Sequence, residues 1–367
     1  MSNPTVEECI KAIEHFAPVS LQESFDNSGL QTGDPKMEVN GALLTIDVTS
    51  SIVEEAIKKG CNLIVSHHPI LLTGIKQITP CNETGNIILN AIKNNIAIYS
   101  AHTNIDNVKQ GVSGILADKL GVINQKVLHP KGNSLVKLAV FVPHDNAEKL
   151  RAALFEAGAG HIGNYDNCSY NSEGTGTFKG NENSNPYKGE KERIHFEPEL
   201  KIEVILQKYK IKEVVNALIA AHPYEEPAYD IIALENSWNE KGLGITGELE
   251  NEIEWNQFLS RIKEITKTGV IKHTNPIKEK IKKVAICGGS GSSFLSSAIA
   301  KSADIYISGD FKYHQFFEAE NRIMIADIGH YESEQFTKEL FFEILTKKFP
   351  NFAVRLSEIN SNPIKYF

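Results

Sequence analysis

The sequence has few cysteines, no long apolar run and no surplus of basic residues. Its five cysteines are far apart and form no C-x-x-C pair, so they give neither a disulfide framework nor a zinc finger: Cys9, Cys61, Cys81, Cys168 and Cys287. No segment approaches the ~18 apolar residues of a membrane span. Charged residues interrupt the N-terminal stretch that a signal peptide would keep apolar. We therefore expect a cytoplasmic protein without a membrane partner.

Charge and composition restrict the possible partners further. The formal net charge is -8, with 38 Lys and Arg against 46 Asp and Glu. Binding that depends on neutralising phosphates needs a basic surplus, so a nucleic-acid partner is disfavoured unless the fold forms a local basic channel. The 367 residues are 41% hydrophobic and 23% charged, as in globular proteins. This length predicts two or three domains.

Two parts of the chain share one layout. Residues 5–16 have the apolar spacing of a short opening helix. Strand-like runs at 42–49, 62–69 and 96–106 then alternate with helix-like segments, which is typical of parallel βαβ units. Near the C-terminus the same alternation recurs, with strand-like runs at 282–291, 303–311 and 322–334. We predict two similar α/β halves, at residues 1–131 and 241–367, that together form one domain.

The intervening stretch, residues 132–240, has a different character. Strand-like residues 134–143 and helix-like residues 145–158 precede a segment rich in Gly, Asn and Ser that suits hairpins and loops. Strand, helix and strand patterns follow at 200–207, 212–221 and 228–236. Two βαβ-like halves on an antiparallel sheet would form a ferredoxin-like α+β domain. We predict that this domain is inserted between the two α/β halves.

Polar residues follow the predicted strands of the N-terminal half. His67 and His68 come directly after an apolar run, and the strand must end there for both side chains to serve one site; Pro69 favours such an end. His102 and Asp106 follow the next run. Open parallel sheets gather functional residues at these carboxyl ends. The alternatives are a surface or packing role for the histidine pair and a helix cap for Asp106.

A third cluster follows the last strand-like run of the C-terminal half. His330 and Glu334 are four residues apart at the expected start of a helix, so they share one face. A solvated His and Glu pair is the alternative. Imidazole and carboxylate ligands without cysteine suit zinc, iron or manganese. Five such ligands exceed the needs of one catalytic zinc but suit two ions ~3.5–4 Å apart that share a carboxylate, and we expect Glu334 to be that bridge.

Two further features carry candidate roles. The segment CGGSGSS (287–293) predicts an anion site at Gly288, Gly289 and Gly291, because glycines let backbone N–H groups approach a phosphate. It lacks the Lys of a P-loop, and a tight structural turn is the alternative. His314, within SGDFKYHQ, and His102 are candidate catalytic residues for proton transfer. A surface histidine is the alternative for His314.

In order, the motifs FDNSGLQTGD (25–34), SHHPI, AHTNID, CGGSG, SGDFKYH and GHYESE resemble those of the GTP cyclohydrolase I type 2 homologues, also called Nif-three-like proteins. The resemblance spans nearly the whole chain. It implies a cofactor of two divalent metal ions, carried over to five residues: His67, His68, Asp106, His330 and Glu334. The segments GAGHIGNYDNCSY and HPYEEPAYD resemble the PII-like or CutA-like insertion of longer members. The family also implies a ring-shaped homohexamer.

The sequence is compatible with two functions. The first is a dinuclear-metal hydrolase of the GTP cyclohydrolase type that acts on a nucleotide or related small molecule. The second is a non-catalytic regulatory or metal-handling hexamer whose insertion senses a ligand. Turnover of nucleotides by the metal-loaded protein discriminates between them. The residue types do not choose among zinc, iron and manganese.

Overall fold

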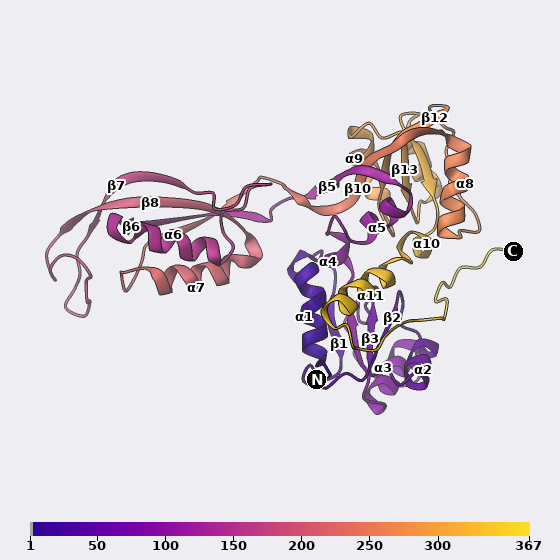
Figure 1. Ribbon diagram of the computed structural model, residues 1–367, viewed down its shortest axis with the longest axis horizontal. Coiled ribbons are helices and arrows are strands. Elements are labelled where there is room, and N and C mark those ends of the chain that lie inside the picture. Colours follow the sequence, from indigo (N-terminus) through magenta and orange to yellow (C-terminus); the bar gives the residue numbers. More distant parts are fainter. Residues whose placement is uncertain (1–2) are drawn as a thin grey trace. The chain divides into compact units, whose positions relative to one another are not determined.

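The computed structural model describes residues 3–367, which fold into two compact units (Figure 1). The first unit consists of Met1–Pro130 and Glu240–Phe367, and the second is the intervening segment Lys131–Asn239. Both units combine helices with β-sheets, so the chain is a mixed α/β protein. Within residues 3–367, no helix is long and apolar enough to cross a membrane.

The first unit contains a five-stranded sheet. In spatial order its strands are β1 (Gly29–Thr32), β4 (Ala97–Ser100), β3 (Leu63–Ser66), β2 (Ala42–Thr45) and β15 (Val354–Leu356). All neighbouring strands pair in parallel except β1, which runs antiparallel to β4. Strands β2, β3 and β4 are buried along their whole length, as parallel strands are when both faces are covered.

Four helices cover this sheet. Thr5, Thr49 and Asn82 each accept a backbone hydrogen bond at a helix start and so begin three of them: α1 (Val6–Phe16), α2 (Ser50–Lys58) and α3 (Glu83–Lys93). Helices α2 and α3 pack on the face that carries alternate strand residues Leu43, Ile64 and Ile98. The fourth helix, α11 (Thr337–Lys348), contacts α1 and β2.

A six-stranded sheet forms the rest of the first unit. Its strands, in spatial order, are β11 (Lys272–His273), β14 (Met324–Asp327), β13 (Ile305–Ser308), β12 (Lys280–Ile286), β10 (Trp238–Glu254) and β5 (Val122–Lys131). Strands β12, β13 and β14 are parallel, β10 runs antiparallel to β12, and β11 runs antiparallel to β14. Helices α5 (Val112–Lys119) and α8 (Trp255–Thr266) pack on one face of this sheet. Helix α9 (Leu295–Ala300) packs on the other face.

The two sheets exchange segments of chain. Strand β15, near the C-terminus, pairs with β2 in the sheet built mainly from N-terminal residues. Strand β5, from the N-terminal part, joins the sheet built mainly from C-terminal residues. The sequence pattern of two separate halves does not reveal this exchange, because a short strand pattern carries no information about its partner. The exchange links the two sheets within one unit.

The strands end earlier than their apolar runs suggest, and the polar residues of interest lie in the bends beyond them. The helix expected from His330 onward is also interrupted, because α10 (His330–Glu334) ends before α11 begins. The Thr337 hydroxyl donates to the Glu334 carbonyl at 2.7 Å, which satisfies a backbone group at the break. The other short helices of the first unit are α4 (Thr103–Asp106), η1 (Val19–Leu21), η4 (Ser292–Phe294) and η5 (Tyr313–Ala319).

The second unit is a four-stranded antiparallel sheet with two helices on one face. Along the chain its elements are β6 (Leu135–Pro143), η2 (His144–Asn146), α6 (Ala147–Glu156), β7 (Tyr170–Phe178), β8 (His195–Gln207), η3 (Lys208–Lys210), α7 (Ile211–Ala221) and β9 (Tyr229–Leu234). The spatial strand order is β7-β8-β6-β9. Helices α6 and α7 contact each other and bury a core with alternate residues of β6 and β8.

A buried carboxylate fixes the start of β13 in the first unit. Asp304 is 3% exposed, and its Oδ2 accepts hydrogen bonds from the backbone N–H groups of Lys282 and Lys283 at 2.9 and 2.8 Å. Its other oxygen pairs with the Lys278 ammonium. Burial alone would raise the pKa of Asp304, but these donors outweigh it and hold the pKa below its ordinary value. The ionised carboxylate therefore stabilises the fold.

We expect Asp304→Asn to destabilise the protein by about 1–3 kcal/mol at pH 7, because an amide cannot accept from all three donors. A lowered carboxyl pKa stabilises above the ordinary pKa of about 4 and loses its effect as pH falls through the folded pKa. The difference between variant and parent should therefore shrink below pH 4. Urea unfolding followed by circular dichroism measures it. Exposed Asp145→Asn is the control, and an equal effect of both substitutions would contradict the assignment.

Candidate metal centre

Four histidines from two sheets lie together in the first unit. His67 and His68 follow β3, His102 follows β4, and His330 is the first residue of α10, just beyond β14. The His68 ring lies 4.8–5.4 Å, measured between centroids, from the rings of His67, His102 and His330. Ends of parallel strands therefore bring these residues together, as the strand-end argument predicted.

The backbone bends directly after Ser66, and this bend lets two consecutive histidines face one site. The hydroxyls of Ser66 and Ser100 both donate to the His68 carbonyl, at 2.9 and 3.2 Å. The His68 amide donates to the Ile46 carbonyl at 2.9 Å. In a regular strand the two rings would point to opposite faces. Here their centroids are 4.8 Å apart.

Each of the four rings uses Nδ1 to contact an oxygen. The His67 Nδ1 lies 2.9 Å from the Ala101 carbonyl oxygen. The other three rings contact carboxylates, at 2.7–2.8 Å: His68 with Asp47, His102 with Asp26, and His330 with Asp310. Such contacts fix the ring orientation and leave Nε2 as the free nitrogen, which is the arrangement of imidazoles that bind metals.

The Nε2 atoms of three of these histidines converge on Glu334, which is 3% exposed. Its Oε2 lies 3.0 Å from the His68 Nε2 and 3.1 Å from the His330 Nε2. Its Oε1 lies 3.6 Å from the His67 Nε2. The same nitrogen of His67 is 3.8 Å from Oδ1 of Asp106. The two oxygens of Glu334 thus face different imidazoles.

Three of these buried atoms lack a well-aligned hydrogen bond within residues 3–367, although an imidazole nitrogen or a carboxylate oxygen lies 3.0–3.8 Å from each. They are His67 Nε2, Asp106 Oδ1 and Glu334 Oε2. Unpaired buried polar atoms are costly, and a native protein seldom leaves three in one place. The ligand atoms of His68, His330 and Glu334 lie within 4.8 Å of one another, as do those of His67, His68 and His102. These donors fit divalent ions such as zinc, iron or manganese.

Electrostatics at the centre also favour a cation. Burial, together with the charge of Glu334, raises the pKa of Asp106 to about 8. Burial alone would lower the pKa values of His68 and His330, but contacts with carboxylates outweigh it and raise them to about 10 and about 11. Burial opposes ionisation of Glu334 as well, yet the nearby imidazoles hold its pKa well below the ordinary value. The directions of these shifts indicate that the carboxylates favour positive charge beside them.

Comparisons with known proteins identify the family of the chain. A model of the family described as Duf34/NIF3 (NGG1p interacting factor 3) matches residues 4–363. The chain belongs to the Duf34/NIF3 family. Among its relatives, the "GTP cyclohydrolase 1 type 2 homolog" proteins of Halalkalibacterium halodurans and Bacillus subtilis are 38% and 36% identical, and the matches cover 97% and 98% of both chains. The predicted resemblance is confirmed.

Comparisons with solved structures extend the likeness to the fold. A Bacillus cereus protein related to NIF3 superposes with a TM-score of 0.83 at 36% identity. The Staphylococcus aureus protein SA1388 superposes with a TM-score of 0.80 at 30% identity. Both comparisons cover 100% of each chain. The whole chain, including residues 131–239, therefore has counterparts in relatives.

Within this Duf34/NIF3 chain, the structure brings together six of the residues singled out from the sequence. These are the five predicted ligands and His102: His67, His68, His102, Asp106, His330 and Glu334. His314 lies elsewhere. It is exposed on η5, its ring contacts Tyr313 at a centroid distance of 5.2 Å, and no described contact joins it to the centre. These contacts favour the surface-histidine alternative.

The glycine loop of the NIF3 chain lies against Glu334, but its N–H groups are already used. The amides of Gly288, Gly289 and Gly291 donate to the hydroxyls of Ser113, Ser333 and Ser308 at 2.9–3.1 Å. None of these three amides is free to bind a phosphate. The hydrogen bonds favour the tight structural turn over the anion site. A Cβ built on Gly289 would lie 2.2 Å from Oε1 of Glu334, so the turn leaves room for that carboxylate.

Sequence reasoning missed the three carboxylates that hold the histidine rings. Asp26 and Asp310 lie within two of the quoted motifs, in FDNSG and SGDF, and Asp47 lies within the strand-like run at 42–49. Each follows an irregular segment or a strand end, but only the folded chain shows which histidine it contacts. Asp310 offers one structural signal, because it is a non-glycine residue with φ +58°, a conformation often retained at functional sites.

We expect Gly289→Ala to lower the metal content of the protein, because its new methyl group would displace the Glu334 carboxylate. Gly60→Ala is a matched control. Gly60 has nearly the same backbone angle, φ +67° against +65°, but its Cβ would meet nothing within 4 Å. Both variants carry the strain of a left-handed alanine, about 1–2 kcal/mol. Elemental analysis of the two folded variants checks the prediction, and equal metal content would refute it.

Proposed function

We propose that the chain is a hydrolase that holds two divalent metal ions and acts on a nucleotide or related small molecule. The proposed ligands are His67, His68, Asp106, His330 and Glu334. The three buried polar atoms without partners carry this proposal, because a metal is the simplest group that pairs all of them at once. The contacts at Nδ1 support it, since each orients a ring with Nε2 toward the centre.

The distances suggest how the ligands are divided between two ions. Asp106 and His67 approach each other and the Oε1 side of Glu334. His68 and His330 approach the Oε2 side, and their Nε2 atoms are 3.3 Å apart. A carboxylate can bind one ion through each oxygen, whereas one imidazole nitrogen serves a single ion. In this proposal Glu334 bridges both positions and His330 belongs to one.

His102 is the proposed proton-transfer residue. Its ring lies edge-on to His67 and His68, with centroids 5.3 and 5.4 Å away, so its free nitrogen shares their site. Asp26 contacts its Nδ1 at 2.8 Å and is itself held by the Thr103 amide at 2.9 Å. A pair of divalent ions supplies Lewis acidity that activates water near neutral pH. The role of His102 would be to exchange a proton at Nε2 while Asp26 keeps the ring in place.

The names of the relatives suggest which substrate to test first. Several are called GTP cyclohydrolase 1 type 2 homologs, so GTP is the leading candidate for this chain. The βαββαβ order of Lys131–Asn239 supports the inference of a ferredoxin-like insertion. The homohexamer and the cytoplasmic location remain predictions from sequence.

The bridging role of Glu334 predicts a difference between two alanine variants. Glu334→Ala should lower metal occupancy at both positions, because two cations would face each other without shared negative charge. His330→Ala should mainly empty one position, leaving about one ion per chain. Metal stoichiometry by elemental analysis, with circular dichroism to confirm folding, measures the difference. His314→Ala, an exposed histidine outside the centre, is the control and should keep the parental metal content.

If Glu334→Ala retained both metals at parental affinity, the bridging assignment would be wrong. Asp106 would then become the better candidate for a shared ligand, because its Oδ1 also faces the centre without a partner.

Turnover is tested separately with protein purified without chelator and loaded with zinc, iron or manganese. We expect at least one metal form to hydrolyse GTP or another nucleotide of a panel, with activity lost on chelation and restored on reloading. Product analysis by chromatography distinguishes ring opening from phosphate release. Nucleotide binding without turnover by all three metal forms would instead support the regulatory alternative.

A further inference from the structure

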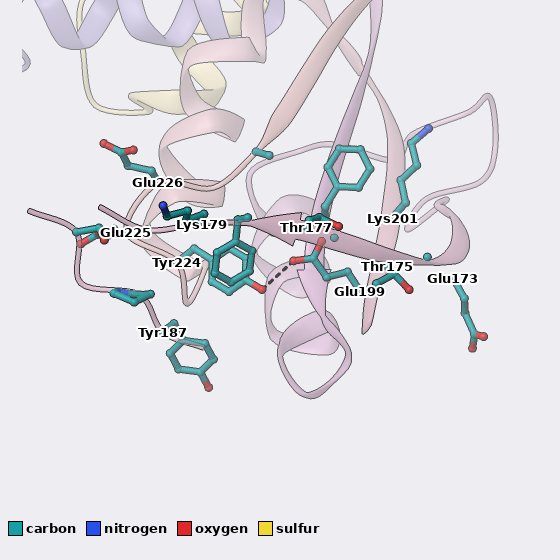
Figure 2. Close-up of a pocket in the computed structure, with 18 of the residues that line it drawn as sticks. Glu173, Thr175, Thr177, Lys179, Tyr187, Glu199, Lys201, Tyr224, Glu225 and Glu226 are labelled. Carbon is teal, nitrogen blue, oxygen red and sulfur yellow. Dashed lines mark hydrogen bonds between the residues drawn. The ribbon is translucent and has the colours of Figure 1, made fainter. Parts of the chain in front are cut away.

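A second candidate site lies entirely within Lys131–Asn239 and contains none of the proposed metal ligands. It is a cavity of about 580 Å³ bounded by β7, β8 and the loops before β9 and β8 (Figure 2). This volume lies within the range of small-molecule sites. Its lining includes three aromatic side chains and one buried carboxylate: Phe178, Tyr187, Tyr224 and Glu199.

Two glycines of β7 shape the cavity. Gly174 pairs with Glu199 across the strands, and a Cβ built on Gly174 would meet nothing within 4 Å. Its missing side chain therefore leaves open space. Gly176 has a different effect, because a Cβ there would lie 2.2 Å from Oε2 of Glu199. The carboxylate occupies the room that a larger residue would take.

Glu199 supplies the specific polar group. It is 7% exposed, and its Oε1 accepts a hydrogen bond from the Tyr224 hydroxyl at 2.8 Å, drawn as the dashed line in Figure 2. No other hydrogen bond to this carboxylate occurs among residues 3–367. A carboxylate has about four acceptor positions, and a buried one is stabilised when donors fill them. The remaining capacity at Glu199 suits a ligand with N–H donors.

Aromatic rings form one wall of the cavity. The Tyr224 ring lies 5.8 Å from that of Phe178 and 6.2 Å from that of Tyr187, measured between centroids. The planes of these rings are tilted by 59° and 51° to one another, so they form an apolar wall rather than one plane. A flat ring can pack face-on against one of them and edge-on against another. The same wall carries the hydroxyl that holds Glu199. A planar ligand on this surface would present its edge to the carboxylate.

The charges that line the cavity disfavour a polyphosphate. Four carboxylates belong to the lining: Glu173, Glu199, Glu225 and Glu226. Its two lysines are already paired with carboxylates outside it, Lys179 with Glu192 at 3.0 Å and Lys201 with Glu203 at 3.2 Å. A phosphate chain would meet an excess of negative charge and no unpaired ammonium of the lining. A neutral or cationic ligand meets no such penalty.

We propose that this cavity binds a planar, amino-substituted heterocycle, of the guanine or pterin type, without a phosphate chain. Glu199 accepts from the ring N–H and amino groups, and Phe178, Tyr187 and Tyr224 pack against the ring. The site goes beyond the hydrolase proposed for the metal centre and does not depend on it. Its occupant differs from a nucleotide in lacking the phosphates.

Calorimetry on the full chain tests the site with guanosine, pterin, xanthosine and GTP. Guanosine or pterin should bind. Xanthosine carries an oxygen in place of the amino group of guanosine, so it should bind at least about tenfold more weakly than guanosine. GTP should bind the cavity more weakly than guanosine. Competition between GTP and the bound heterocycle separates this cavity from the metal centre.

Gly174→Val should fill the open space and weaken binding at least about tenfold. Glu199→Gln should weaken binding by a similar factor, because it removes an acceptor. Asn171→Val is the matched control, because Asn171 is exposed on the same strand and does not line the cavity. Gly174 has ordinary backbone angles, so valine adds no left-handed strain. Metal content should stay at the parental level in all three variants.

Three results would overturn the proposal. One is the absence of binding by both guanosine and pterin at millimolar concentration. Another is binding that both Gly174→Val and Glu199→Gln leave unchanged. The third is GTP competing at the cavity more tightly than guanosine, which would show a phosphate site. None of these results depends on whether the metal centre hydrolyses a nucleotide, so failure of this proposal and of the hydrolase proposal are distinguishable.

Discussion

Burial of negative charge at the metal centre is the constraint on which the rest of the first unit depends. Glu334 is 3% exposed and Asp106 has a buried oxygen without a partner. A buried carboxylate is stable only when positive charge or hydrogen-bond donors compensate the lost hydration. The imidazoles can compensate it as cations, or as ligands of a shared metal. Their raised pKa values show how strongly the carboxylates attract a positive charge.

This constraint explains why two sheets are needed. One sheet presents His67 and His68 where β3 ends, and the other presents His330 and Glu334 on α10 beyond β14. The ends of parallel strands supply such positions without long loops. Strands β15 and β5 each join the sheet of the opposite part of the chain, so the chain passes from one sheet to the other and back. The residues of the candidate centre are thereby held by secondary structure on both sides.

The proximity of these residues could be predicted because strand ends and motif order are local features. His67, His68, Asp106, His330 and Glu334 could each be placed after an apolar run, and their convergence followed from parallel topology. The partners of the rings could not be predicted, since Asp26 contacts a residue 76 positions away and nothing local specifies that pair. The same limit hid the strand exchange. The glycine loop was misleading for another reason: its composition suits an anion, but serines from three other segments occupy its amides.

The two candidate sites differ in what they can neutralise. At the metal centre, carboxylates and imidazole nitrogens face one another, and metal ions bound there would present positive charge to a phosphate or a polarised ring. In the cavity of residues 131–239, carboxylates outnumber lysines and both lysines have other partners. Long-range attraction of a polyphosphate therefore favours the first site and opposes the second. A guanine-type ring could suit both sites. The presence or absence of a phosphate chain on that ring would then decide which site the ligand occupies.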